Sequence, residues 1–281
     1  ASDVYKRQCY DAEILYNKVN IFERRKDLRS EIITAGKSIN LALSKRGWTA
    51  LEKAGIKHEV MKIAIPVYKR IMHDNKGILT DQPYGNEGEA IYSVSRAQMN
   101  VLMMNLAEKN GASLHFNEKC VDVDFEQSIA TFENTNSRKV QSVSSDFLVG
   151  ADGTFSAVRK KMVAKYKHDY EYREIDHDYK ELLIPSANDG SYLLDKNALH
   201  IWPRGNFMLL ALPNLDGSFT CTLFAAKKGL NYFEGLKSNN LVDNFFSKIF
   251  PDFFKLVAVV SLASEMEVLP TLLASASSKI V

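Results

Sequence analysis

The chain has 281 residues, 46% hydrophobic and 25% charged, an ordinary globular composition that excludes a disordered or fibrous protein. Its 36 Lys and Arg against 34 Asp and Glu give a formal net charge of +2, and neither sign forms a long block. We therefore expect no nucleic-acid or anionic-membrane partner. The three cysteines, Cys9, Cys120 and Cys221, are far apart and form no C-x-x-C pair, so we expect no disulfide framework, no metal site and a reducing compartment.

No apolar stretch approaches the roughly 18–20 residues that a membrane span requires. The best candidate, Leu256 to Ala263, has only eight residues. The sequence therefore predicts a soluble, cytoplasmic chain. It begins with Ala1 and has no signal-peptide pattern, and we interpret both ends as truncations.

The first part of the chain gives both strand and helix signals. Val19 to Glu23 is a β-branched and aromatic run that predicts a buried strand, and a basic loop follows it. Ser44 to Ala54 begins with a capping serine and is followed by Gly55, which is typical of an amphipathic helix. From Tyr68 to Gln82 the residues alternate around a turn at Asn75-Lys76-Gly77, which predicts a hairpin.

The clearest helix begins at Ser95 and ends at Gly111, with apolar residues at i, i+3, i+4 and i+7. Alternating runs from Ser113 to Phe132 predict short strands. Phe147-Leu148-Val149 then predicts a buried strand that leads into the turn Gly150-Ala151-Asp152-Gly153 and a further helix. Strand, acidic-glycine turn and helix in this order are typical of nucleotide-binding enzymes.

The last part of the chain, from Tyr179 on, is rich in strand signals. Leu199 to Trp202, Phe207 to Leu212 and Ser218 to Phe224 predict an antiparallel sheet, and helical spacing returns from Leu241 to Phe250. No linker or repeat separates the two kinds of structure. We therefore expect two domains that interleave along the chain.

Two acidic residues follow predicted strands and are candidates for a nucleotide site. Glu23 fits the acid that accepts hydrogen bonds from a ribose, although the 22 residues before it contain no G-x-G-x-x-G, so a solvated strand-end glutamate remains an alternative. Asp152 lies before a helix whose N-terminus attracts phosphate. Asp-Gly is also an ordinary turn, and both readings stay open for this residue.

Arg70 shares one strand face with Tyr68 and Met72, where it either reaches solvent or presents its guanidinium to an anion. Tyr84 lies in a loop, where it is likewise either a structural residue or a ligand-binding one. His200 alternates with Trp202 and is interpreted as a satisfied strand histidine. No H-x-x-H, nucleophile elbow or Walker loop is present, which argues against hydrolases and P-loop enzymes.

Several strings resemble the kynurenine 3-monooxygenase family of flavin-dependent aromatic hydroxylases, which are of the para-hydroxybenzoate hydroxylase type. They are KSINLALSKRG (37–47), IPVYKRIMH (65–73), QPYG (82–85), SVSR (93–96), GADGTFSAVR (150–159), LHIWPR (199–204) and ALPNLDGSFTCTLF (211–224). The resemblance runs from about Val19 to Phe254. Two family elements are absent, a glycine-rich loop expected before Asp11 and a Gly-Asp motif expected beyond Val281.

The resemblance implies a fold of the α/β class (α+β mixed). An incomplete FAD/NAD(P)-binding Rossmann-like domain, residues 1–60 and 91–167, would interleave with an antiparallel β-sheet substrate domain, residues 61–90 and 168–255. Residues 256–281 form a poorly matched tail.

The resemblance also implies the chemistry. Such an enzyme reduces FAD with NADPH, forms a flavin C4a-hydroperoxide with O2 and hydroxylates L-kynurenine to 3-hydroxykynurenine, a step of tryptophan degradation toward NAD. The flavin carries this chemistry, so no side chain is expected to be catalytic. By similarity, Arg70 and Tyr84 bind the substrate carboxylate, and the ring pocket is lined by Leu199, Leu210, Leu212 and Phe224. For FAD, similarity indicates Glu23 and Arg24 near the adenosine, Ala42 and Cys120 through their backbone, Arg96, and Asp152.

Two alternatives remain beside this interpretation. One is another flavin hydroxylase of the same fold that acts on a different aromatic acid. The other is a non-catalytic fragment or binding module, because residues 1–281 lack the glycine-rich loop and are not expected to hold FAD alone. The sequence leaves open the oligomeric state and the preference for NADPH or NADH. It also leaves open whether the full protein has the C-terminal anchor that eukaryotic relatives use at the mitochondrial outer membrane.

Overall fold

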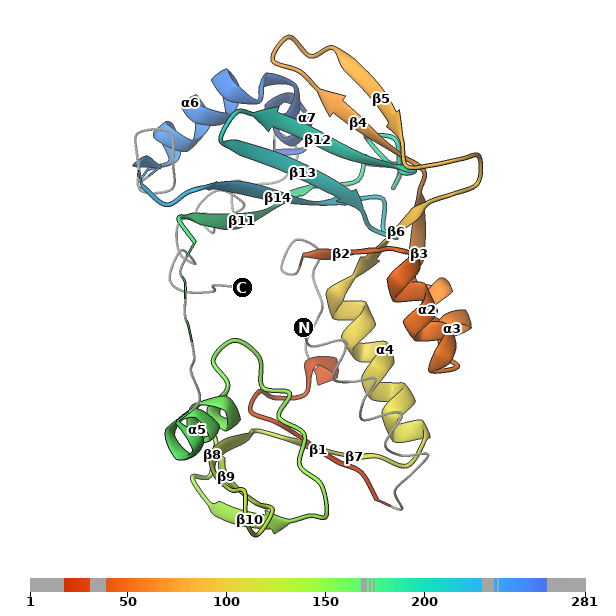
Figure 1. Ribbon diagram of the computed structural model, residues 1–281. Coiled ribbons are helices and arrows are strands. Elements are labelled where there is room, and N and C mark those ends of the chain that lie inside the picture. Colours follow the sequence, from red (N-terminus) through yellow and green to blue (C-terminus); the bar gives the residue numbers. More distant parts are fainter. Residues whose placement is uncertain are drawn as a thin grey trace. The chain divides into compact units, whose positions relative to one another are not determined.

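The computed structural model (Figure 1) describes residues 18–30, 39–167, 171, 173, 175–228, 235–236 and 238–261, with side chains as far as 257. The chain divides into two compact units, each built from two separate stretches of sequence. Unit 1 contains residues 1–33 and 100–173, and unit 2 contains residues 34–99 and 174–280. The predicted mixed α/β class is therefore confirmed, whereas the predicted division into a cofactor domain and a substrate domain stays a prediction.

Unit 1 contains two small sheets. Strands β1 (Asn20–Glu23) and β7 (Ser113–Phe116) pair in parallel, and β8 (Glu118–Asp124), β9 (Ile129–Asn134) and β10 (Val140–Ser144) form an antiparallel sheet in the order β10-β9-β8. Phe22 of β1 links the two sheets, because its ring stacks on Phe132 at 4.0 Å and on His115 at 4.6 Å between centroids. Unit 1 also contains the short 3-10 helix η1 (Leu28–Ser30) and helix α5 (Ala157–Tyr166).

Unit 2 contains a three-stranded and a six-stranded sheet. Strands β2 (Asn40–Leu43), β6 (Ile91–Ser95) and β3 (Ala64–Val67) are antiparallel in the order β2-β6-β3. The large sheet has the order β11-β14-β13-β12-β4-β5 and is antiparallel except where β12 and β4 pair in parallel. Its strands are β4 (Lys69–His73), β5 (Leu79–Pro83), β11 (His177–Ile184), β12 (Ala198–Arg204), β13 (Phe207–Pro213) and β14 (Phe219–Ala226).

Five further helices complete the described part of the chain. Helices α2 (Lys45–Lys53), α3 (Lys57–Met61), α6 (Asn239–Ile249) and α7 (Pro251–Ser261) belong to unit 2. Helix α4 (Arg96–Lys109) contributes residues to both units. Among the described residues, none of the helices is long and apolar enough to cross a membrane.

The core of unit 2 lies on one face of the large sheet, where α6 and α7 pack. Strand residues such as Leu209, Ala211 and Leu223 alternate toward this face and meet Phe246 and Phe250 of the helix pair. Leu209, Ala211 and Phe250 are 0% exposed. The other face of the same strands is thereby left to a different set of side chains, which includes most of the predicted substrate residues.

Most predicted elements are confirmed. The helix after Ser44, the helix after Ser95 and the hairpin with its turn at Asn75-Lys76-Gly77 form as α2, α4 and β4–β5. The predicted strand Phe147-Leu148-Val149 is wrong, because these residues form no strand and are 69%, 38% and 43% exposed. Val19 to Glu23 does contain a strand, β1, but it is half-buried rather than buried. The half-burial of β1 follows from its pairing, because the β1–β7 sheet has only two strands among the described residues.

Candidate functional site

Most of the residues predicted to bind the substrate lie on one face of the large sheet. Arg70 of β4 is the register partner of Leu199 of β12, and Ile201 of β12 is the partner of Leu210 of β13. Partners in register lie on the same face, as do residues two apart on one strand. Leu212 therefore shares the face of Leu210. Phe224 is included as well, because its partner on β13 is Met208, two residues before Leu210.

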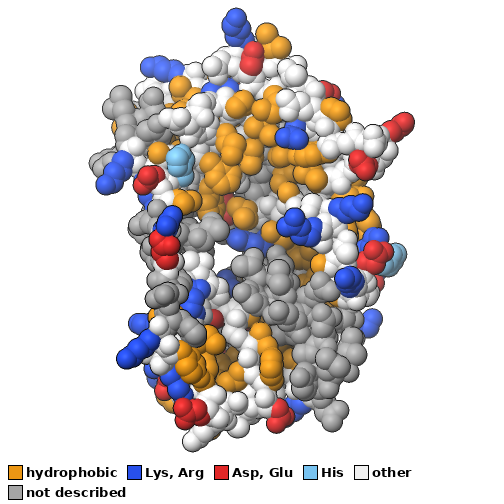
Figure 2. Space-filling view, in the orientation of Figure 1, with side chains coloured by type: hydrophobic (Ala, Val, Ile, Leu, Met, Phe, Trp, Pro, Cys, Tyr) orange, Lys and Arg blue, Asp and Glu red, His pale blue; other side chains and the backbone are white. Residues whose placement is uncertain are grey.

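This face is apolar and stays open in part. Leu210, Leu212 and Phe224 are half-buried, Met208 is 40% exposed, and Leu199 is almost fully buried. Figure 2 shows hydrophobic side chains gathered over the part of unit 2 that β12, β13 and β14 form. An apolar surface that the described helices leave uncovered can accept a flat hydrophobic ligand.

Arg70 and Tyr84 meet next to this face. The guanidinium carbon of Arg70 lies 4.8 Å from the centroid of the Tyr84 ring, in cation–π range. Tyr84 follows the end of β5 and is held by its backbone N–H, which donates to the carbonyl of Tyr68 at 3.0 Å. Burial raises the pKa of the Tyr84 phenol, and the charge of Arg70 opposes this shift. The phenol therefore stays protonated and can donate a hydrogen bond at neutral pH.

The guanidinium of Arg70 has an unsatisfied donor. Its Nε is buried and has no hydrogen-bond partner among the described residues. The neighbouring cation Lys69 differs, because its Nζ lies 2.7 Å from Asp81 and 3.3 Å from Asp195. A buried donor without a partner costs free energy, which a carboxylate ligand would recover through a charge-assisted hydrogen bond. Arg70 is thus suited to bind an anionic group beside an apolar surface.

Glu23 ends β1, as its sequence predicts, and is ionised. Burial opposes this ionisation, but hydrogen bonds from Arg25 outweigh it and lower the pKa of the Glu23 carboxyl. The backbone N–H of Arg25 donates to Oε1 at 2.9 Å, and its guanidinium donates to both carboxylate oxygens at 3.1 Å. The Glu23 side chain is nevertheless 36% exposed, so its oxygens also remain open to ribose hydroxyls. Arg24 is exposed beside it.

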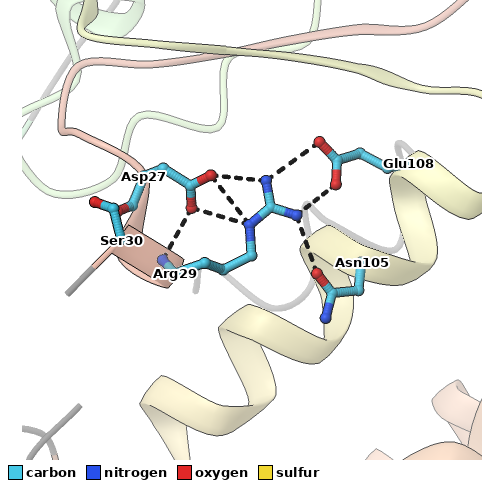
Figure 3. Close-up of polar contacts among 5 residues, drawn as sticks. All are labelled: Asp27, Arg29, Ser30, Asn105 and Glu108. Carbon is cyan, nitrogen blue, oxygen red and sulfur yellow. Dashed lines mark hydrogen bonds and ion pairs between the residues drawn. The ribbon is translucent and has the colours of Figure 1, made fainter. Parts of the chain in front are cut away.

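The loop after β1 is fixed to α4 by Arg29 (Figure 3). Its guanidinium donates to Asp27 at 2.8 Å and to Asn105 at 3.0 Å, and it also donates to Glu108. The hydrogen bonds to Glu108 and Asp27 raise the pKa of Arg29, so the side chain stays charged. These hydrogen bonds of Arg29 hold in place the segment that follows Glu23 and Arg24.

Asp152 lies at the N-terminus of α5. Its Oδ2 accepts from the backbone N–H groups of Ala157 at 2.6 Å and Val158 at 3.1 Å, and its Oδ1 accepts from the Ser156 hydroxyl. The Ser156 hydroxyl oxygen in turn accepts from the N–H of Arg159 at 2.8 Å. The carboxylate therefore caps the helix, a structural role that the turn reading of the sequence left open.

Cys120 of β8 lies within electrostatic range of Asp152. Burial raises the pKa of the Cys120 thiol, and the charges of Asp152 and Asp122 raise it further. Ala42 and Arg96 belong to unit 2, where Ala42 is exposed in β2 opposite Ser93 and Arg96 is the first residue of α4. The assignment of these residues to the cofactor stays a prediction.

The comparisons with known proteins decide the family. Residues 34–191 match the family described as FAD binding domain, which is more than half of the chain. The chain belongs to this FAD-binding domain family. An ionised, partly exposed acid at the end of a strand, as at Glu23, fits the ribose of such a cofactor.

Several relatives with known names have sequences similar to that of this chain. Over 236 residues it is 47% identical to kynurenine 3-monooxygenase of Christiangramia forsetii, which covers 84% of this chain and 53% of that enzyme. It is 41% identical over 241 residues to kynurenine 3-monooxygenase of Dictyostelium discoideum, with 85% and 51% covered. The chain thus spans about half the length of the curated relatives it matches.

Solved structures share the fold. A variant of 2-methyl-3-hydroxypyridine-5-carboxylic acid oxygenase gives a TM-score of 0.64 at 16% identity, over 90% of this chain and 63% of that one. A probable FAD-dependent monooxygenase from Pseudomonas aeruginosa gives 0.64 at 13% identity, over 91% and 67%. At these identities the likeness shows a common fold.

Sequence reasoning missed two sets of residues. Ile201 and Met208 lie on the same face as the predicted ring residues, and the period of two that places Leu199 and Leu210 there also identifies them. His73 and Asp252 meet behind the sheet, 179 positions apart in the sequence. No local pattern signals that contact.

Proposed function

We propose that the chain is part of a FAD-dependent monooxygenase that uses NADPH and O2 to hydroxylate L-kynurenine to 3-hydroxykynurenine. The names of the relatives support this activity. The structural observation that carries it is the unsatisfied Nε of Arg70, stacked on Tyr84 beside an apolar sheet face. A hydrogen-bond donor for a carboxylate next to an apolar surface matches an aromatic α-amino acid.

The chain's own residues bind and orient this substrate. Arg70 donates to the carboxylate, and the protonated Tyr84 phenol adds a second donor. The aromatic ring lies on the apolar surface of Leu199, Leu210, Leu212 and Phe224, which excludes water from it. Fixing the carboxylate at one end and the ring on a rigid sheet presents a single ring edge for reaction.

The flavin, when bound, supplies the redox chemistry with O2. The candidates to hold it are Glu23 and Arg24 for the adenosine part, the backbone of Ala42 and Cys120, and the side chains of Arg96 and Asp152. We propose no catalytic side chain. Cys120 and Cys221 are free thiols, which suits the reducing cytoplasm where we place the enzyme.

A second candidate is hydroxylation of another aromatic acid. The same observation at Arg70 supports it, because a guanidinium binds any carboxylate. The length of the substrate separates the two candidates, since kynurenine places three carbons between its carboxylate and its ring, whereas benzoates place none.

The test is to measure NADPH oxidation and product formation with the full-length enzyme and bound FAD. We expect L-kynurenine to stimulate NADPH oxidation and to yield 3-hydroxykynurenine, and salicylate and 4-hydroxybenzoate to yield no hydroxylated product. Hydroxylation of a benzoate without any of kynurenine would favour the second candidate. NADPH oxidation that no aromatic acid stimulates would contradict both.

A further inference from the structure

Two buried histidines form a hydrogen-bonded chain behind the substrate face. His73 of β4 and His200 of β12 are 4% and 2% exposed. His73 Nδ1 lies 2.8 Å from Asp252 Oδ2, and His73 Nε2 lies 3.0 Å from His200 Nδ1. His200 Nε2 lies 3.0 Å from the carbonyl oxygen of Asp195. Asp252 belongs to α7, so the chain ties that helix to two adjacent strands.

Counting protons across these three contacts gives the charge of the pair. Each hydrogen bond needs one proton, and both ends of the chain, the Asp252 carboxylate and the Asp195 carbonyl, can only accept. Three protons must therefore reside on the four imidazole nitrogens. Two neutral imidazoles carry two protons, so the pair holds one more and has a single positive charge.

The surroundings decide where that charge lies. Burial opposes ionisation of Asp252, but hydrogen bonds from His73 and Trp202 outweigh it and hold its pKa at about 2. The Trp202 indole N–H donates to the same Oδ2 at 2.7 Å, whereas Oδ1 has no partner among the described residues. Burial lowers the pKa of His200 to about 4, although its hydrogen bond to the backbone of Asp195 opposes this shift. The positive charge that the proton count requires therefore lies in a pair that contacts the ionised Asp252 carboxylate directly through His73.

Other charged groups lie near this hydrogen-bonded chain. Asp195 favours a charge on His200, whereas Lys69 disfavours it. Arg204 of β12 lies within electrostatic range of Asp252 and Asp74, and it donates to the backbone carbonyl of His73 at 2.9 Å. Imidazole is the side chain whose charge normally changes near neutral pH, so a change of charge there belongs to the histidine pair.

The hydrogen-bonded chain of Asp252, His73 and His200 lies directly behind the predicted carboxylate site. His200 follows Leu199 along β12, and His73 is three residues after Arg70 on β4. Side chains alternate along both strands, so the histidines point to the α7 face while Arg70 and Leu199 point to the other. We propose that His73 and His200 together carry one positive charge beside Asp252, and that the three act as positioning residues, which hold β4 against β12 so that Arg70 stays aligned with the apolar face. This rests on the proposed function.

Loss of the proton breaks one of the three hydrogen bonds. Kynurenine binding should therefore weaken as the pH rises through the apparent pKa of the pair, with the KM rising and the kcat little changed. The first test is to follow the imidazole 15N chemical shifts of the full-length, FAD-loaded enzyme over roughly pH 6 to 9, beside the KM. We expect one imidazolium in the pair and a common midpoint for both titrations. Two neutral imidazoles throughout would overturn the single positive charge of the pair.

The second test is Asp252→Asn, which removes the compensating charge with little change of shape, against the control His58→Gln. His58 is an exposed histidine of α3 in the same unit and outside the chain. We expect Asp252→Asn to raise the KM roughly tenfold or more at every pH, as for a slightly misplaced binding group, and to remove the pH dependence, while His58→Gln matches the wild type.

An Asp252→Asn enzyme that retains FAD and the wild-type KM profile would overturn the positioning role. Should this variant fail to fold, coincidence of the two wild-type midpoints decides the same point, and separate midpoints would contradict it. Absence of kynurenine turnover in the wild type would overturn the proposed function and the positioning role together. The imidazole shifts would still decide the proton count in that case.

Discussion

Arg70 of β4 is the register partner of Leu199 of β12, in the one parallel pair of the large sheet. This pairing places a cation with an unsatisfied donor directly beside the first of the apolar residues on that face. In the proposed binding mode, the distance between a carboxylate held at Arg70 and a ring on β12–β14 would therefore be set by strand spacing, which backbone hydrogen bonds make rigid. We expect that a substrate of the wrong length would not satisfy both ends of this proposed site.

We expect Arg70→Ala in the full-length enzyme to lose kynurenine binding and to retain FAD. Loss of a buried guanidinium–carboxylate pair costs roughly 2–5 kcal/mol, or about 30-fold to several-thousand-fold in affinity. The measurement is KM for kynurenine together with the flavin absorbance of the purified variant. Lys69→Met is the matched control, because it removes a cation of the same strand that is already paired with Asp81. An unchanged KM in Arg70→Ala would make Arg70 a structural residue.

Local signals were enough to predict much of this fold. Helices α2 and α4 have serines before them and glycines after them, and the β4–β5 hairpin has its turn residues within the segment. The face of Arg70 follows from alternation alone. Its partner does not, because β4 and β12 lie far apart in the chain and the register between them depends on packing of the whole sheet.

The same limit explains what sequence reasoning missed. His200 was expected to be a satisfied strand histidine, and it is, but its partner His73 lies 127 positions away. Phe147-Leu148-Val149 has the composition of a buried strand, yet composition does not supply the neighbouring strand that would cover it. The predicted turn at Asp152 was a local inference, and its carboxylate does cap the helix that follows.

Arg29→Met should destabilise unit 1 in a pH-dependent way. Arg29 lowers the pKa of both Asp27 and Glu108, so its contribution is present above the ordinary carboxyl pKa of about 4 and is lost as the pH falls through their lower folded values. We expect a loss of about 1 kcal/mol in the free energy of unfolding at neutral pH, because the pairs are partly exposed. Urea unfolding at neutral and acidic pH measures it.

The control for Arg29 is Arg138→Met, which removes an exposed ion pair with Glu133 in the same unit. Its effect should be a few tenths of a kcal/mol at most. Equal destabilisation of the two variants would contradict the stabilising role of the Arg29 hydrogen bonds shown in Figure 3. An Arg29→Met effect that persists unchanged at acidic pH would contradict it as well.

Asp152 has two expected roles, which two substitutions separate. Asp152→Ala should lower the free energy of unfolding by about 1 kcal/mol through loss of the cap on α5, and should also weaken FAD retention. Asp152→Asn keeps a capping oxygen, so it should retain stability while still weakening FAD retention and flavin reduction. Flavin absorbance after desalting and chemical unfolding measure the two effects. An Asp152→Asn enzyme with full flavin content and normal turnover would leave only the capping role.

Cys120 offers a probe of the cofactor assignment that does not depend on turnover. Burial and then the charge of Asp152 raise the pKa of its thiol, so alkylation should be slow at pH near 8 and faster in Asp152→Asn, because the thiolate is the reactive form. Bound FAD that contacts the β8 backbone at Cys120 would cover the thiol and slow its alkylation several-fold. Peptide mass mapping of the full-length enzyme, with and without FAD, measures this. The fully buried Cys221 is the internal control and should stay unmodified in both samples. Equal alkylation of Cys120 in the two samples would remove it from the cofactor site, whereas unchanged reactivity in Asp152→Asn would contradict the electrostatic link between these two residues.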